Sequence, residues 1–485
     1  MSVLFILLTF VSLSLQSFIH PGLLVTEADI TRASNNLNRA PWNTSYAQLT
    51  ACSCASTDYE PSPVSAVYRA TTTERAANTN YLWNDAAAAF ALALRWKLTN
   101  NDSYAETASG ILTAWAAKLV TIDDTDDGYL TSGFQGHELA NAAELLRDYA
   151  PFAEDGLDAV KTFMTSVFLP MNLDFLNHKL GSEHNVKHFF ANWELGNLAS
   201  AMAIAVLTEN STVWDFAIEY FKSGSGNGNI NNAVTDLHID PDTGLTLGQG
   251  QESGRDQGHS ALDWQMLGVI GQQAWNQGVD LFSYNNSRIL QGAEYFARYN
   301  LGHDVPFNNY TNGIVSFDCI SNASRGSTRP TWELFYSHYV QIKGMDAPWT
   351  TAYLNYSLHQ YGGVEPGAGL SGSTSGAFDG LGWGSLLYHR DDNDTTVPSY
   401  SASLTASRTS RQSAPATTIS TTQYSNSSVV TFSTSATSQD GITTAAISTA
   451  THLSALSLSQ SVPQAHRHNT AMRMAVMAIA IATPE

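Results

Sequence analysis

The segment GQGQESGRDQGH, Gly248–His259, concentrates side chains that can carry out acid–base and carboxylate chemistry. Arg255 and His259 are four residues apart, as are Glu252 and Asp256, so each pair shares a face once a helix has begun. An apolar helical pattern follows directly. A polar, glycine-rich loop that enters a core helix can hold reactive groups rigidly beside a cleft. We therefore expect a functional site here.

Two interpretations of the charges in this segment are open. Glu252 or Asp256 could hold Arg255 in a purely structural ion pair. Alternatively, Arg255 binds an anionic ligand, with Gln251 beside it. The chain carries 43 acidic and only 23 basic residues, a net charge of −20, so an anionic ligand would need a locally placed cation. The same charge argues against nucleic acid as a partner.

A second cluster lies in GSEHNVKHFFANWELGN, residues 181–197. Asn192 and Trp193 open an almost wholly apolar helix, where a buried amide must find a hydrogen-bond partner. We expect Asn192 to belong to the site. His184 and His188 are either further site residues or solvated groups at the helix start.

Arginine and tyrosine recur at helical spacing near the end of the globular region. Arg329 precedes a helix start, and Tyr336 lies seven residues later on the same side. Such a pair could bind a carboxylate and move a proton. Tyr295 is either a core residue or a further site tyrosine. The cysteine and histidine spacing is not typical of metal ligands, so neither a metal nor another cofactor is expected.

Apolar periodicity predicts mostly helices before residue 344 and few strands. The predicted helices are Leu82–Leu98, Tyr104–Leu119, His137–Tyr149, Leu157–Leu176 with Pro170 inside it, Asn192–Leu207, Val213–Phe221, Gln257–Trp275, Arg288–Asn300 and Trp332–Lys343. Successive helices with short connections suggest an all-α fold, an (α/α) toroid of antiparallel pairs. A helical solenoid is the alternative.

Composition divides the chain into three parts. Residues 1–17 are typical of a secretory signal peptide, because their apolar run is too short to span a membrane comfortably. Residues 20–390 form the predicted helical domain. Residues 391–485 form a Ser/Thr-rich tail that we expect to be disordered and O-glycosylated. Its apolar end, Ala471–Thr483, leaves anchoring to a membrane or cell wall as an alternative.

Sequons and cysteines also indicate an extracellular protein. The N-x-S/T sequons lie at Asn43, Asn101, Asn210, Asn285, Asn309, Asn322, Asn355, Asn393 and Asn426. Of the three cysteines, Cys52 and Cys54 are too close to pair readily, so we expect one of them to bond with Cys319. A secreted, monomeric glycoprotein is the resulting expectation.

The globular part, from His20 to Arg390, resembles the alginate lyase-like family of polysaccharide lyases. The resemblance rests on the motifs HPGLL, ELANAAELLRDY, GQGQESGRDQGH, AWNQGVDLF, ILQGAEYFARYNLG, RPTWELFYSHY and FDGLGWGSLLY. It implies an (α/α) toroid and β-elimination of an anionic uronic-acid polysaccharide, of the alginate or glucuronan type.

The resemblance also implies roles for individual residues. Asn192 matches the family's carboxylate-neutralising amide, but Trp193 follows it where the well-studied alginate lyases have a histidine. His259 is then the first candidate for the base, with His188 and Tyr336 behind it. Arg255 would bind the carboxylate and Tyr336 would be the proton donor, with Tyr295 in reserve. Expected substrate-binding residues are Arg329, Gln251, His188, Trp193 and Tyr295.

Two other functions fit some of these features. A glycoside hydrolase on a helical toroid would use paired carboxylates, and Glu252 with Asp256 is the obvious pair. However, carboxylates four apart on one helix would lie on the same side of a substrate rather than flank its bond. A cell-wall glycoprotein that only binds polysaccharide would also fit the Ser/Thr-rich tail.

Overall fold

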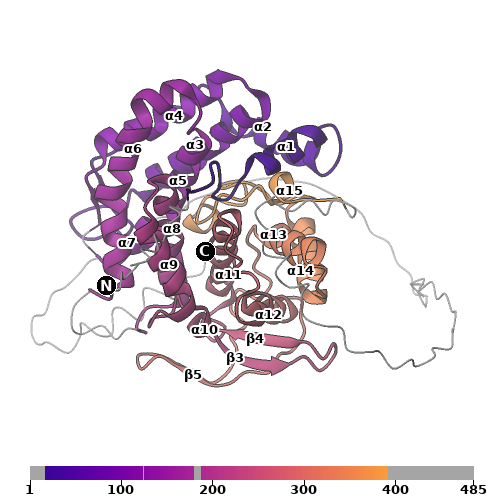
Figure 1. The fold of residues 1–485 in the computed structure, drawn as a ribbon. Helices are drawn as coiled ribbons and strands as arrows, with labels where there is room; N and C mark the ends of the chain where they lie inside the picture. Colours follow the sequence, from indigo (N-terminus) through magenta and orange to yellow (C-terminus); the bar gives the residue numbers. More distant parts are fainter. Residues whose placement is uncertain (1–16, 124, 180–186, 392–485) are drawn as a thin grey trace, which may run out of the picture. The chain divides into compact units, whose positions relative to one another are not determined.

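The computed structural model describes residues 17–123, 125–179 and 187–391. The predicted signal peptide, His184 and the predicted tail after Asp391 lie outside the described residues. The described part is mostly helical (Figure 1). Its α-helices are α1 (Glu27–Asn36), α2 (Trp42–Ala51), α3 (Thr79–Thr99), α4 (Asp102–Lys118), α5 (Gly128–Leu145), α6 (Leu157–Phe163), α7 (Leu169–Leu176), α8 (Ala191–Leu207), α9 (Ser211–Ser223), α10 (Ile230–Ala233), α11 (Gln257–Asn276), α12 (Tyr284–Asn300), α13 (Trp332–Phe335), α14 (Pro348–Gln360) and α15 (Gly384–Leu387).

Short two-stranded sheets interrupt the helices. The strands are β1 (Ala66–Val67), β2 (Thr121–Ile122), β3 (Val234–Ile239), β4 (Thr246–Gly250), β5 (Tyr310–Thr311) and β6 (Ser316–Phe317). β1 pairs with β2 in parallel, while β3–β4 and β5–β6 are antiparallel hairpins. β4 packs on α12 and leads directly into the polar segment before α11. This β3–β4 hairpin was not predicted from the sequence.

The helices α5, α8 and α11 are buried along nearly their whole length. Such helices cannot be amphipathic in the usual sense, and glycine and alanine let their backbones approach closely. A Cβ on Gly133 of α5 would lie 2.8 Å from the carbonyl carbon of Gly196 on α8, and one on Gly136 would lie 2.1 Å from the Ser200 hydroxyl. Small residues therefore set the spacing between these two helices.

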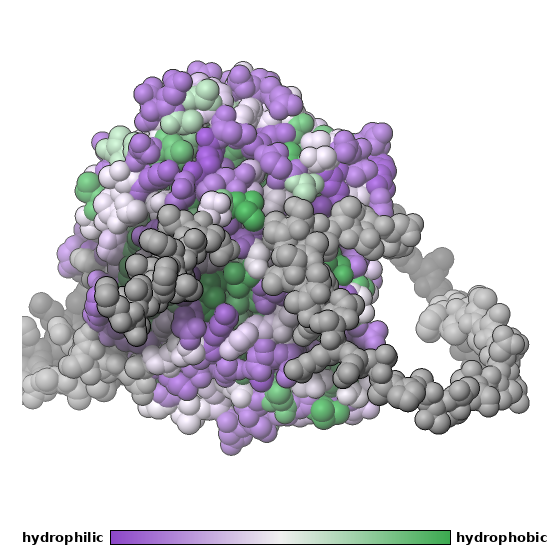
Figure 2. Space-filling model, in the orientation of Figure 1, coloured by the Kyte–Doolittle hydropathy of each residue, from purple (hydrophilic) through white to green (hydrophobic). Residues whose placement is uncertain are grey.

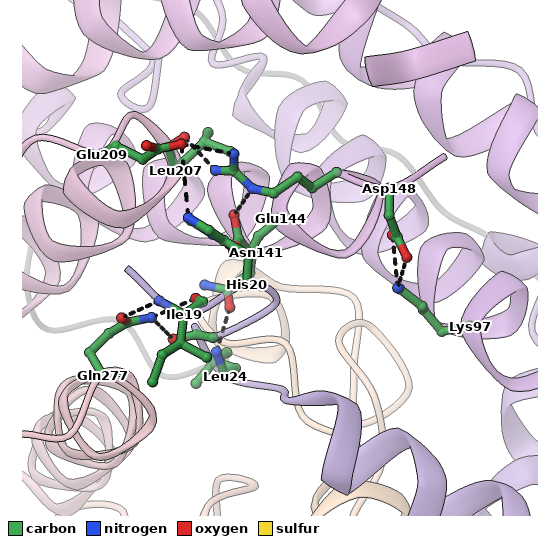
Figure 3. Close-up of polar contacts among 12 residues, drawn as sticks. Ile19, His20, Leu24, Lys97, Asn141, Glu144, Asp148, Leu207, Glu209 and Gln277 are labelled. Atoms are coloured by element: carbon green, nitrogen blue, oxygen red, sulfur yellow. Dashed lines mark hydrogen bonds and ion pairs between the residues drawn. The ribbon is translucent and has the colours of Figure 1, made fainter. Parts of the chain in front are cut away.

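The HPGLL segment near the N-terminus connects α5 to the end of α11 (Figure 3). The backbone N–H of Ile19 donates to Gln277 Oε1 at 2.9 Å, and that of Leu24 donates to Asn141 Oδ1 at 2.9 Å. The His20 ring contacts the buried Glu144 carboxylate. This motif therefore has a structural role in holding two buried helices together.

Most predicted helices match the structure, with instructive differences. α5 begins at Gly128, nine residues before the predicted start at His137, because Gly133 and Gly136 serve helix packing and do not break the helix. The predicted helix Leu157–Leu176 is continuous through π-helical turns and Pro170 lies in the first turn of α7, where its missing N–H costs nothing. None of the helices in the described ranges is long and apolar enough to cross a membrane.

The disulfide prediction was wrong. Cys52 and Cys54 are joined, with their Cα atoms 5.1 Å apart, and Cys319 is a free, exposed thiol. A 3₁₀ turn at Ser53–Ala55 brings the two sulfurs together despite their short separation. The rule that such close cysteines rarely pair failed because the local turn supplies the required geometry.

Candidate functional site

The segment Gly248–His259 leaves strand β4, turns, and enters α11. Asp256 is the N-cap of α11, with extended backbone angles, and its Oδ1 accepts the backbone N–H of His259 at 2.9 Å. The helix therefore begins after Asp256, so Glu252 and Asp256 do not share a helical face as the spacing had suggested. His259 lies in the first turn, and its side chain is 40% exposed.

Two consecutive side chains from this segment cap the start of α8. Phe190 precedes α8 and offers no side-chain cap of its own, so the first N–H groups need partners from elsewhere. Gln251 Oε1 accepts the N–H of Ala191 at 3.0 Å, and Glu252 Oε1 accepts that of Asn192 at 3.1 Å. The polar segment is thereby fixed against the beginning of α8, 60 residues earlier in the chain.

The Glu252 carboxylate brings the two predicted carboxylate-binding residues together. Its Oε1 also accepts the Asn192 side-chain amide at 2.5 Å, and its Oε2 accepts Arg255 Nη1 at 2.8 Å. The Glu252 side chain is wholly buried, whereas that of Arg255 is 13% exposed. Asn192 and Arg255 thus share one buried anion, which fixes their relative positions.

Arg255 connects this buried carboxylate to His259. Its Nη2 lies 3.2 Å from His259 Nε2, and His259 Nδ1 lies 2.6 Å from Asp256 Oδ2. Because a guanidinium only donates, Nε2 must be the acceptor, which places the ring proton on Nδ1 facing Asp256. This tautomer leaves Nε2 unprotonated, so it can act as a base when Arg255 turns from it to another acceptor.

Two neighbouring carboxyl groups differ in how tightly they hold a proton. Burial alone would raise the pKa of Asp256, but hydrogen bonds and charge from His259, with a contribution from Arg255, bring it below its ordinary value. Burial, together with the charge of Glu252, raises the pKa of Asp263 well above its ordinary value. Asp263 therefore holds its proton more tightly than Asp256 does. The charge of Arg255 is already balanced within the site.

Aromatic rings surround this network. The Arg255 guanidinium lies 4.1 Å from the centre of the Phe190 ring, a cation–π contact. Trp193 and Phe189 pack with their ring centres 4.8 Å apart, and the His188 ring contacts Phe189 at 4.7 Å. His188 and Trp193, both predicted to bind substrate, thus belong to one half-buried aromatic cluster at the start of α8.

The β5–β6 hairpin covers the polar segment and contributes a tyrosine that the sequence analysis had not singled out. The Tyr310 hydroxyl accepts Gln251 Nε2 at 2.7 Å. Phe317 occupies the space beside Gly254, where a Cβ would approach its ring carbon to 2.7 Å. This glycine therefore serves packing. No local pattern marks Tyr310, because its partner is 59 residues away.

Three predicted site residues have contacts outside the Glu252–Arg255–His259 network: Arg329, Tyr295 and Tyr336. Arg329 Nη1 donates to Gln265 Oε1, to the Gly376 carbonyl and to Asp379 Oδ2 at 2.9–3.3 Å. The Tyr295 ring is 1% exposed, and its hydroxyl donates to the Pro306 carbonyl at 2.8 Å. Tyr336 is half-buried and packs against the hydrophobic core. Their proposed roles stay predictions.

A cavity of about 380 Å³ lies beside Arg329, between the segment 326–329 and the loop 371–377. Gln265 is six residues after His259 on α11, about 9 Å farther along the helix axis, so the Arg329 contacts lie apart from the His259 network. Among the residues that the structure describes, no group of three or more His, Cys, Asp or Glu side chains could hold a metal ion.

Figure 2 shows a hollow with hydrophobic residues, near the centre of a largely hydrophilic face.

Comparison with known proteins gives one family and a set of related folds. A family model described as alginate lyase matches residues 29–305. A variant of alginate lyase A1-III complexed with a tetrasaccharide is 13% identical, with a TM-score of 0.50 over 78% of this chain and 98% of that chain. Its likeness at this identity concerns the mostly helical fold alone. A search of curated protein sequences finds no match.

Two other solved structures are less similar. Alginate lyase A1-III from Sphingomonas species A1 is 14% identical, with a TM-score of 0.45 over 78% of this chain and 99% of that chain. An alginate lyase from Bacteroides ovatus is 12% identical, with a TM-score of 0.41 over 58% of this chain and 84% of that chain.

Proposed function

Since the chain belongs to the alginate lyase family and is a polysaccharide lyase, we propose that it cleaves a uronic-acid polysaccharide, of the alginate or glucuronan type, by β-elimination. One observation carries this proposal. His259 is accessible, has an unprotonated Nε2 that accepts from Arg255, and is linked through Arg255 to the buried Glu252–Asn192 pair. This arrangement supports the proposal that a base lies beside two groups that bind the substrate carboxylate.

In the proposed mechanism, the carboxylate of the substrate is neutralised first. The Asn192 amide has a second N–H, and Arg255 Nη2 can move from His259 to the substrate. Both donors stabilise the negative charge that develops when the proton beside the carboxylate leaves. Because Glu252 already balances the charge of Arg255, neutralisation depends on directed hydrogen bonds more than on net positive charge.

His259 then removes the proton. Nε2 takes it, and the imidazolium that forms is stabilised by Asp256, 2.6 Å from Nδ1. A tyrosine protonates the departing glycosidic oxygen. Tyr336 is the donor suggested by the sequence, while Tyr310 is a tyrosine that contacts the site.

The helices are proposed to form an incomplete (α/α) toroid. α3, α5, α8 and α11 pack successively, and the intervening α4, α7 and α9 pack on them. Asn141 Nδ2 of α5 donates to Gln273 Oε1 of α11 at 3.3 Å. In a flat row, helices two places apart would be separated by about 16–20 Å. This contact across α8 supports a curved row in preference to a straight solenoid.

Secretion is also part of the proposal. The predicted signal peptide and tail lie outside the described residues, so it rests on their sequences and on the sequons. Five sequon asparagines are exposed in the structure: Asn43, Asn101, Asn309, Asn322 and Asn355. Such positions are accessible to glycosylation. A monomeric extracellular enzyme is the state we propose.

The test is a panel of uronans incubated with the purified protein. β-Elimination creates a conjugated double bond that absorbs in the ultraviolet, and we expect this absorbance with at least one uronan. New reducing ends without the absorbance would instead indicate a hydrolase. Binding without either product would indicate a binding protein. Either result would overturn the proposal.

A further inference from the structure

We propose that Tyr310, on the β5–β6 hairpin, is the residue that protonates the leaving glycosidic oxygen. This inference rests on the proposed lyase function and deepens it. Tyr310 lies outside every motif that supports the family resemblance, and it comes from a different part of the chain than Tyr336 or Tyr295.

The position of Tyr310 is set by Gln251. Gln251 Nε2 donates to the Tyr310 hydroxyl at 2.7 Å, while Gln251 Oε1 accepts the N–H of Ala191 at 3.0 Å. One amide side chain therefore spans from the tyrosine to the start of α8. Asn192, the next residue after Ala191, is held by Glu252, the next residue after Gln251. The hydroxyl thus belongs to the same set of contacts as the carboxylate-binding amide.

The hydrogen bond leaves Tyr310 suited to donate a proton. Its oxygen accepts from Gln251, so its own O–H can point toward another acceptor. The same N–H stabilises the phenolate that remains after donation. Burial raises the pKa of Tyr310 above its ordinary value, so the group is protonated at neutral pH. The side chain is only partly buried, which leaves access for a substrate.

The hairpin that carries Tyr310 is fastened to both sides of the site. Asn312 Nδ2 donates to the His188 carbonyl at 3.1 Å, on the segment before α8. Gln257 Nε2, in the first turn of α11, donates to the Ser321 carbonyl at 3.0 Å. Phe317 stacks on Phe190 with ring centres 6.4 Å apart. These contacts hold Tyr310 in place although it lies in a hairpin of only two residue pairs.

Tyr295 and Tyr336 are less suited to protonate the leaving oxygen. The Tyr295 hydroxyl donates its proton to the Pro306 carbonyl, and its ring is 1% exposed. Tyr336 packs against the hydrophobic core in the π-helical segment Tyr336–Ile342. Neither position resembles that of Tyr310, whose partner directly caps the helix bearing Asn192.

His259 Nε2 accepts the proton beside the carboxylate, and the electron pair of that C–H bond forms the new double bond. The bond from the neighbouring ring carbon to the glycosidic oxygen breaks, and that oxygen takes the Tyr310 proton. The products are an unsaturated uronate, a free hydroxyl on the departing sugar, an imidazolium and a phenolate. A proton returned from His259 to Tyr310 through water restores the enzyme.

The test compares Tyr310→Phe with the wild type on two substrates. The first is the uronan that the wild type cleaves. The second is a uronate with a nitrophenyl group on the oxygen that leaves, because nitrophenolate departs without protonation. We expect Tyr310→Phe to be slower by roughly 100-fold or more on the uronan and within about threefold of the wild type on the nitrophenyl substrate. Tyr104→Phe, on the distant helix α4, is the matched control. It removes a hydroxyl that accepts a hydrogen bond from Arg95, and it should retain activity on both substrates.

A loss of equal size on both substrates would indicate a structural role and overturn the inference. So would full activity of Tyr310→Phe on the uronan, or the expected pattern in Tyr336→Phe. If the wild type forms no ultraviolet-absorbing product, the proposed function fails and the inference fails with it. The pH profile of the wild type gives a second readout that needs no variant. Activity on the uronan should fall at alkaline pH as Tyr310 ionises, whereas activity on the nitrophenyl substrate should not.

Discussion

The starts of α8 and α13 use the same solution to a common problem. The first N–H groups of a helix lack partners within it, and in both cases a buried glutamate from a distant segment accepts them. Glu252 Oε1 accepts the N–H of Asn192 at 3.1 Å. Glu365 Oε1 accepts those of Thr331, Trp332 and Glu333 at 2.7–3.2 Å.

The two caps differ in what the second carboxylate oxygen contacts. Glu252 Oε2 holds Arg255, which reaches the accessible His259. Glu365 Oε2 has no hydrogen-bond partner within the described residues. Burial, with the charge of Glu333 nearby, raises the pKa of Glu365 to about 8. Of the two buried carboxylates, only that of Glu252 has contacts, within the part of the chain that the structure describes, that continue to an exposed titratable group, and it is the one in the candidate site. The Glu365 carboxylate is a structural cap.

The largest expected loss of activity follows substitution of His259, the exposed end of the Glu252–Arg255–His259 network. We expect His259→Gln to lower kcat/KM on the cleaved uronan by roughly 10²–10⁴-fold, because the proposed base is lost. Thermal unfolding should be nearly unchanged, since the side chain is 40% exposed. His359→Gln, at an exposed position near the end of α14, is the control. Activity within about twofold of the wild type would remove His259 from the mechanism.

The next effect concerns the residue that orients the base. Asp256→Asn should lower kcat by roughly 100-fold, because an amide no longer selects the tautomer with the proton on Nδ1 or stabilises the imidazolium. Asparagine can still cap α11, so the melting temperature should change little. Steady-state kinetics with a melting curve checks both statements. A large loss of stability with unchanged kcat would indicate that Asp256 only caps the helix.

Substituting each capping glutamate, Glu252 and Glu365, compares the two caps directly. Glu252→Gln should lower the free energy of unfolding by about 3 kcal/mol, because Arg255 then loses its buried partner. It should also lower kcat/KM by at least about tenfold, because Asn192 and Arg255 are displaced. Glu365→Gln should leave kcat/KM within about twofold. Denaturant unfolding and kinetics measure the two quantities. Equal losses of activity in both variants would contradict the distinction between the caps.

The smallest expected effect is the pH dependence of stability that the Glu365 cap contributes. The pKa of Glu365 is about 8 in the folded protein and about 4.3 in an unfolded chain. The folded state therefore binds this proton more tightly, and its contribution to stability is lost as pH rises from about 4.3 to 8. Glu365→Gln does not titrate, so its melting temperature should improve relative to the wild type by roughly 5 °C between pH 5 and pH 8.5. A difference that does not vary with pH would contradict the raised pKa.

Local signals in the sequence were sufficient for the buried helices that support the site. The predicted helices Asn192–Leu207 and Gln257–Trp275 differ from α8 and α11 by one residue at one end. Apolar content defines their length, and Asp256 supplies a cap that can be recognised from its residue type. The start of α5 was missed because Gly133 and Gly136 resemble helix breakers, although they allow close packing on α8.

The candidate site was predictable only in part. The spacing of Arg255 and His259 placed them together correctly, although Arg255 precedes the helix and its side chain reaches His259 past the N-cap Asp256. The association of Asn192 with this pair was implied by the family resemblance, and the Glu252 contact that produces it spans 60 residues. Tyr310 was missed because it lies in a short hairpin without periodicity. The contacts of Arg329 with Gly376 and Asp379 could not be anticipated either, since they depend on a loop about 50 residues later.

The sequence by itself determined the features of this protein that depend on neighbouring residues. It specified the helical class, the family, and the polar segment that enters α11 with a histidine one turn after an arginine. Only the tertiary structure decided that Glu252 contacts Asn192, that Gln251 contacts Tyr310, and that Glu365 ends in an isolated cap. The physical reason is that hydrogen bonds between distant segments depend on how far one helix start lies from another. Helix packing sets that distance, and no local period in the sequence encodes it.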